Sequence, residues 1–137
     1  MGNQIAVWTM DETSGSTVAD SLGKYNGTAT GTTIIDGVSG KARHFIGSSS
    51  HRILFSSPII PTGSFVVKLK FRVASIPTSY YCLMSNGAAN FGENSFYISI
   101  IPSGINGSGL IYATVKLSDG THLCYTPSDE SVCDNAW

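Results

Sequence analysis

Charged residues are scarce in this sequence. Asp, Glu, Lys and Arg make up 12% of the 137 residues, whereas they make up about 25% of a typical globular domain. The net charge is −1 and there are only eight Lys and Arg, so no basic run is present to attract a nucleic acid or an anionic membrane surface. No stretch reaches the roughly 18 consecutive apolar residues of a membrane span. We therefore expect neither nucleic acid binding nor membrane insertion, and we expect no signal peptide at the start of this chain.

Apolar residues at helical spacing are also missing, and strand-like alternation takes their place. In residues 64–73, Phe65, Val67, Leu69, Phe71 and Val73 share one face of an extended chain, while Val66, Lys68, Lys70 and Arg72 share the other. Residues 95–101 and 110–117 alternate in the same way. Such segments are typical of antiparallel strands with one face in the core and one in water.

Glycine-containing turn pairs separate these segments. Asn-Gly or Asp-Gly pairs begin at Asn26, Asp36, Asn86, Asn106 and Asp119. Short strands punctuated in this way predict an all-β protein, an antiparallel β-sandwich or barrel. Two of the pairs, at Asn26 and Asn106, also fit the pattern of a glycosylation acceptor, but turn geometry explains them better.

The three cysteines give an odd count. Cys124 and Cys133 flank a turn-rich segment and are spaced to form a disulfide across it, whereas three reduced thiols fit the spacing equally well. Both alternatives stay open. Cys82 is expected to be a small buried apolar residue.

Three groups of residues resemble the concanavalin A-like, laminin-G-type jelly-roll family in its N-terminal part. The first strand and turns match at Trp8, Met10, Asp11, Glu12, Ser14, Gly15, Asp20, Asn26 and Gly27. A following "GKAL-F-G" segment matches at Gly40, Lys41, Ala42, Phe45 and Gly47, and a "GSFTV" strand at Gly63, Ser64, Phe65 and Val67. The resemblance implies one jelly-roll β-sandwich domain over residues 1–137. Because the family continues into further strands where Trp137 stands, we favour a domain truncated at its C-terminal end over a fold that closes with fewer strands or by pairing with a second copy.

The resemblance also assigns roles to the early residues. Trp8, Met10 and Phe45 are expected as inward anchors of the first strands, and Asp20 is expected to cap a turn by accepting backbone N–H bonds. Calcium bound by Asp11, Glu12 or Asp20 is the alternative.

Two departures weaken family properties. The sequence has Ile46 and Ser50 where relatives carry the Asp residues of an F-D-G segment, which counts against a calcium site. It has Lys70 where relatives often place a Trp, which removes an aromatic from the outward face.

Catalytic constellations are absent from the sequence. Glu12, Glu93 and Glu130 are isolated, unlike the E-x-D-x-x-E arrangement of jelly-roll glucanases, and a glycosidase needs two carboxylates facing one cleft. The three histidines, at positions 44, 51 and 122, lack metal-ligand spacing. We therefore expect no enzyme, with a glycosidase surviving only if carboxylates follow residue 137.

The function implied by the resemblance is non-catalytic binding of glycans or glycoproteins by a secreted, cell-surface or phage-virion protein. Sugars stack on aromatic faces and are read by amides, hydroxyls and a few charges. The candidate ligand-binding residues are Tyr97, Tyr112, Arg72, Lys70, Asn86, Asn90 and Asn94. The alternatives are an ordinary solvated sheet face and an assembly module of a surface or phage tail protein that self-associates through its sheet edges.

Overall fold

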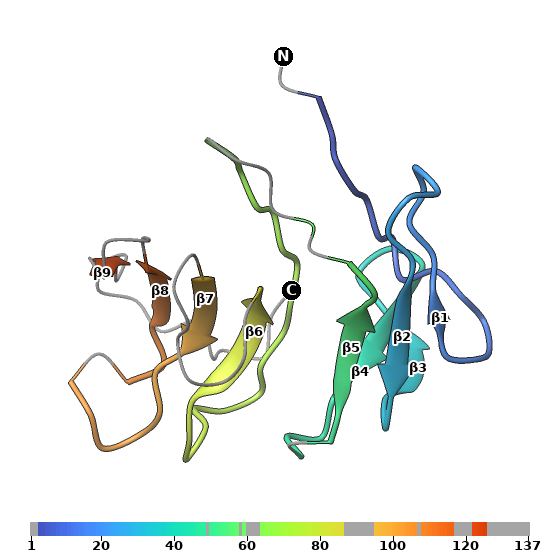
Figure 1. Cartoon of the computed structure of the whole chain (residues 1–137). Coiled ribbons are helices and arrows are strands. Elements are labelled where there is room, and N and C mark those ends of the chain that lie inside the picture. The colour runs from blue at the N-terminus through green and yellow to red at the C-terminus, as the bar shows by residue number, and fades with distance from the viewer. Residues whose placement is uncertain are drawn as a thin grey trace. The chain divides into compact units, whose positions relative to one another are not determined.

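The computed structural model describes residues 3–48, 50–57, 59, 64–86, 95–106 and 108–116, together with the backbone of 122–125. These residues form nine strands and no helix, and every pair of neighbouring strands is antiparallel (Figure 1). The chain divides into two compact units, Met1–Ser64 and Phe65–Trp137. The prediction of an all-β, antiparallel protein is confirmed. The jelly-roll arrangement stays a prediction, because the described strands form three small sheets.

The first unit contains a three-stranded sheet and a separate hairpin. The sheet has the order β1-β2-β5 and the hairpin pairs β3 with β4. The strands are β1 (Thr17–Val18), β2 (Gly27–Thr30), β3 (Thr33–Asp36), β4 (Lys41–His44) and β5 (Arg52–Phe55). Val18 and Ala29 are buried and alternate with exposed threonines, so one face of the sheet carries the small core of this unit.

Trp8 anchors the residues before β1 to this sheet. Its ring lies against the ring of Phe55, with 4.5 Å between centroids, and its indole Nε1 donates a hydrogen bond to the Tyr25 carbonyl oxygen at 2.7 Å. The expected role of Trp8 is thus observed. The expected inward role of Phe45 is wrong, since this side chain is 43% exposed after the end of β4, and Phe55 is the aromatic that packs on Trp8.

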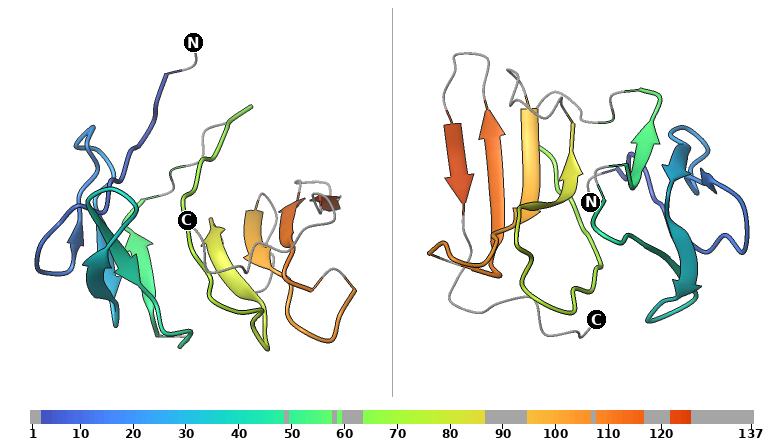
Figure 2. Two further views of the ribbon diagram at one scale, coloured as in Figure 1. Left: turned by 180° about the vertical axis from the view of Figure 1, so that it is seen from behind. Right: turned by 90° about the horizontal axis from the view of Figure 1, so that it is seen from below.

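The second unit contains a four-stranded sheet in which each strand pairs with the next along the chain. The strands are β6 (Tyr81–Ser85), β7 (Ser95–Ile100), β8 (Ile111–Lys116) and β9 (His122–Tyr125). Figure 2 shows them side by side in this order. The strands expected from alternation in residues 95–101 and 110–117 are therefore confirmed as β7 and β8. A register shift between Cys82 and Met84 adds one residue to β6, which places a bulge at Leu83.

The expected strand at residues 64–73 pairs with none of the strands that the structure describes. Alternate residues of this segment still lie on one side. Val67, Leu69 and Phe71 line a groove of about 230 Å³ together with side chains of the four-stranded sheet. Those sheet residues are Leu83, Ile98, Ile111 and Ala113. Alternation does not supply a strand partner, so the strand prediction is wrong. The predicted apolar face is only partly right: Val67 and Phe71 are half-buried, whereas Phe65 and Leu69 are 38% and 43% exposed.

Alanine substitutions at Gly40 and Gly23 test how closely the Asp11 side chain approaches Gly40. Both have a left-handed backbone, with φ of 72° and 74°, but a Cβ at Gly40 would overlap Asp11 Oδ1, whereas a Cβ at Gly23 would meet nothing within 4 Å. Gly23→Ala should lower the free energy of unfolding by about 1 kcal/mol through backbone strain alone, and Gly40→Ala by about 2 kcal/mol or more. Urea unfolding of the two variants measures the difference, and equal losses would contradict the close approach of Asp11.

Candidate functional site

Asp20 is a buried carboxylate that accepts four backbone hydrogen bonds. Its Oδ1 accepts the N–H groups of Val7 at 2.8 Å and Leu22 at 3.1 Å. Its Oδ2 accepts those of Lys24 and Tyr25, both at 3.0 Å. The predicted role of Asp20 in capping a turn is confirmed. The carboxylate also joins the chain before β1 to the turn before β2.

These four bonds decide the ionisation of the group. Burial alone would raise the pKa of Asp20, but the backbone donors more than offset it and lower the pKa to about 2. The Asp20 N–H is itself bonded to Asn26 Oδ1 at 2.9 Å. A carboxylate whose oxygens are both occupied by fixed backbone donors has little capacity left to hold a cation.

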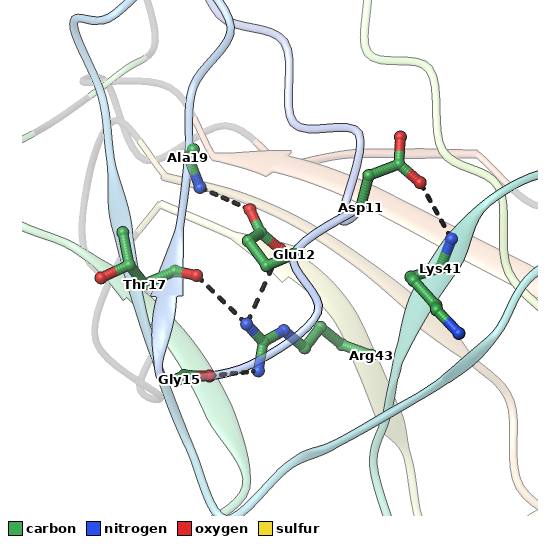
Figure 3. A network of polar contacts seen from close by, with 7 residues as sticks. All are labelled: Asp11, Glu12, Gly15, Thr17, Ala19, Lys41 and Arg43. Carbon is green, nitrogen blue, oxygen red and sulfur yellow. Dashed lines mark hydrogen bonds and ion pairs between the residues drawn. The ribbon is translucent and has the colours of Figure 1, made fainter.

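Asp11 and Glu12 also bind the backbone (Figure 3). Asp11 Oδ1 accepts the Lys41 N–H at 2.9 Å, and Glu12 Oε1 accepts the Ala19 N–H at 2.7 Å. Within the residues described, no group of three His, Cys, Asp or Glu side chains converges as a metal site would require. The acidic pair thus fastens the loop before β1 to its neighbours, and none of its contacts supports the calcium alternative.

Arg43 completes this network from β4. Its side chain is 3% exposed, and its guanidinium donates to the carbonyl oxygens of Gly15 at 3.0 Å and Thr17 at 3.1 Å. Glu12 Oε2 lies 3.6 Å from Arg43 Nη2 (Figure 3). The buried charge is compensated by one carboxylate and two backbone dipoles, so the loop from Glu12 to Thr17 is held by a structural ion pair.

The second unit carries the aromatic candidates on one face of its sheet. Tyr97 pairs with Thr114, and Ser99 with Tyr112, across β7 and β8. Tyr80, directly before β6, brings its ring to 6.4 Å from that of Tyr112, at an interplanar angle of 58°. We call these five residues the tyrosine face. Since neighbouring residues on a strand point to opposite sides, this face is opposite to the one that bears Ile98 and Ala113 and lines the groove.

The tyrosine face is more buried than alternation predicts. Ser99 is 0% exposed and Thr114 is 2% exposed, so the expectation of a solvated face is wrong at both positions. Tyr80, by contrast, is 48% exposed. Partial desolvation raises the pKa of Tyr97, which leaves its phenol protonated and able to donate a hydrogen bond at neutral pH. On the tyrosine face, therefore, the short side chains of Ser99 and Thr114 are buried, and the longer side chain of Tyr80 is exposed beside them.

The other candidate ligand residues do not join the tyrosine face. Lys70 and Arg72 are exposed on the segment whose alternate side chains, Leu69 and Phe71, turn toward the groove on the opposite side of the sheet. Asn86 connects the ends of β6 and β7, because its Oδ1 accepts the N–H of Phe96 at 2.6 Å. Two further candidates, Asn90 and Asn94, lie outside the described residues, and the structure does not place them.

Sequence reasoning missed Tyr80 and misjudged Cys82. The thiol is exposed rather than buried, and partial desolvation raises its pKa. Cys82 pairs with Ser99, so it belongs to the same side of the sheet as the tyrosine face. The available signal was the tripeptide Tyr80-Tyr81-Cys82, in which alternation puts the first and third residues on one side. The proposed bridge between Cys124 and Cys133 stays a prediction, since Cys133 lies outside the described residues.

No family model, no curated protein and no solved structure matches this chain. In the part of the chain that the structure describes, no helix is long and apolar enough to cross a membrane.

Acid titration tests the role of Asp20. Because its pKa falls from an ordinary 3.8 to about 2 on folding, the carboxylate stabilises the protein fully above its ordinary pKa, and this stabilisation is lost as pH falls through about 2. Asp20→Asn should lower stability at neutral pH and flatten the acid dependence between those values, as measured by urea midpoints across pH.

Asp36→Asn is the matched control. The Lys41 ammonium lies 2.6 Å from the Asp36 carboxylate and lowers its pKa, but the Asp36 side chain is 87% exposed. Exposed pairs of this kind contribute little to stability, because solvent screens the two charges. An Asp36 variant that lost as much stability as the Asp20 variant would contradict the special position of Asp20.

Proposed function

We propose that this protein is a non-catalytic carbohydrate-binding module of the laminin-G-like jelly-roll type, and that the tyrosine face is its glycan site. The single observation that supports this most is the contact between the Tyr80 and Tyr112 rings beside the hydroxyl-bearing row of β7 and β8. Sugar rings stack their apolar faces on aromatic side chains while neighbouring polar groups bind their hydroxyls. The chain is proposed to work in an extracellular, cell-surface or virion setting.

The tyrosine face combines the two elements that sugar recognition needs. Tyr80 is nearly half exposed and presents ring surface, and the phenol hydroxyls of Tyr97 and Tyr112 are donors and acceptors on a sheet that fixes their spacing. Neither cofactor nor metal is needed by such a site. Lys70 and Arg72 would serve a glycan only as a separate contact, because their segment lies over the groove side of the sheet.

A catalytic function is not proposed. Asp11, Glu12 and Asp20 each accept backbone N–H groups, and none of these three carboxylates is available as the paired acid and base that glycoside hydrolysis uses.

Assembly with other protein chains is the second candidate, and one observation favours it. Residues 64–73 pair with none of the described strands, and Lys68, Lys70 and Arg72 are exposed along them. A segment without a strand partner can add to a strand of another chain, preferably one with acidic residues. In that case the protein would be a structural module of a surface or phage tail protein.

A glycan array probed with the intact chain tests the carbohydrate proposal. We expect binding to at least one glycan class in the presence and absence of calcium. Tyr112→Ala should weaken it at least about tenfold, the effect of losing roughly 1.4 kcal/mol of stacking and hydroxyl contacts.

Tyr81→Ala is the matched control for this experiment. Tyr81 neighbours Tyr80 in sequence but pairs with Ile100 on the other side of the sheet, so its removal should leave glycan affinity unchanged. Failure of the intact chain to bind any glycan, together with a stable oligomer in solution, would overturn the carbohydrate proposal in favour of assembly.

A further inference from the structure

The side of the four-stranded sheet opposite the tyrosine face is packed unevenly. On this side the rings of Phe65 and Phe96 meet edge to face, with 5.9 Å between their centroids, and Phe96 is 5% exposed. Four residues further along the same segment, Leu69 is 43% exposed although it lines the groove beside the sheet. Close packing therefore ends where the groove begins, and apolar side chains are left partly in water there.

The groove is apolar along all of its described lining. On the sheet side it spans three neighbouring strands, since Leu83 belongs to β6, Ile98 to β7 and Ala113 to β8. Its volume is about 230 Å³. An apolar cavity of about 150 Å³ binds benzene, so by proportion this groove accommodates roughly nine carbon atoms. None of the described lining side chains carries a polar atom, so water inside the groove finds no hydrogen-bond partner among them.

Positive charge lies beside this groove. Residues 67–72 alternate between side chains that line it and exposed cations, and the cations are Lys68, Lys70 and Arg72. In the described part of the second unit, Lys116 is a fourth cation and neither Asp nor Glu occurs. The flexible stem of a lysine lets its ammonium group reach past the edge of the chain segment that carries it. The rim of the groove therefore suits a negatively charged group.

We infer that this groove binds a free long-chain carboxylate. The hydrocarbon tail lies against Leu69, Ile98 and Ala113, and the carboxylate stays at the rim with Lys68 and Lys70. The charged head remains outside because burying it among the apolar lining side chains would leave it without a hydrogen-bond partner. This site goes beyond glycan binding, since the tyrosine face is on the other side of the sheet.

Titration of the intact chain with decanoate, below its micelle-forming concentration and followed by NMR of methyl groups, tests this site. The methyl signals of Leu69, Ile98 and Ala113 should shift together. Affinity should rise about fourfold for each methylene from hexanoate to decanoate, the gain expected from burying a methylene group. Decyltrimethylammonium has a tail of the same length and the opposite charge, so it should bind more weakly than decanoate. Equal affinities for the two, or methyl signals that do not move, would overturn the proposal.

Ala113→Leu and Val115→Leu form a matched pair on β8. Both residues belong to the same side of the sheet, but only Ala113 is among the residues that line the groove. Leucine at position 113 adds three carbons to a space for roughly nine, so decanoate affinity should fall at least about tenfold. Thermal unfolding of this variant should occur at or above the parental temperature, because filling a cavity stabilises a fold. Val115→Leu should bind decanoate as the parent does.

Replacing both Lys68 and Lys70 by Gln tests the contact with the carboxylate and leaves the lining of the groove unchanged. Decanoate should bind this double variant about two- to fivefold more weakly, as expected for the loss of exposed ion pairs. Lys116→Gln is the control, because alternation along β8 puts Lys116 on the tyrosine side of the sheet. Undiminished decanoate binding by Ala113→Leu, or a lysine double variant that loses no more affinity than Lys116→Gln, would overturn the proposal.

Discussion

The buried carboxylate of Asp20 is the constraint on which the first unit depends. Three backbone N–H groups from the turn that follows Asp20 and a fourth from Val7, before β1, converge on this carboxylate. The same turn brings Trp8 into a β-bridge with Asp20 and aligns its indole with the Tyr25 carbonyl oxygen. A single charge thus fixes the path of the chain into the small core around Val18. At the adjoining loop, charged side chains also form hydrogen bonds with the backbone, namely those of Asp11, Glu12 and Arg43.

In the second unit the four-stranded sheet separates two different surfaces. One side gathers aliphatic residues such as Ile98 and Ala113 around the groove beneath residues 64–73. The other side gathers tyrosines and short hydroxyl residues. Strand alternation alone produces this separation, because successive residues of β7 point to opposite sides of the sheet. The proposed glycan site depends on that separation, since an aromatic face is available for sugar only if the core is served by the opposite face.

The sequence predicted the elements that rest on local rules and missed those that rest on distant partners. Alternation located β7 and β8, and the short polar side chain of Asp20 in a Gly-rich stretch indicated a turn cap. The exposure of Phe45 and the contact of Trp8 with Phe55 depend on which strand lies beside which, and no local pattern contains that information. The predictions for residues 64–73 and for Ser99 were wrong for the same reason. Strand pairing and the burial of a residue depend on its neighbours on adjacent strands, which a local pattern does not contain.

Backbone donors, and not a metal ion or solvent, occupy the Asp20 carboxylate. Hydrogen exchange of individual amides, followed by NMR on the intact chain, measures whether these donors are bonded to the carboxylate. The Val7, Lys24 and Tyr25 amides should exchange far more slowly than those of the exposed loop residues Thr13 and Ser14, with or without added calcium. Exchange of the three amides at the rate of those loop amides, or protection that appears only when calcium is added, would contradict the claim.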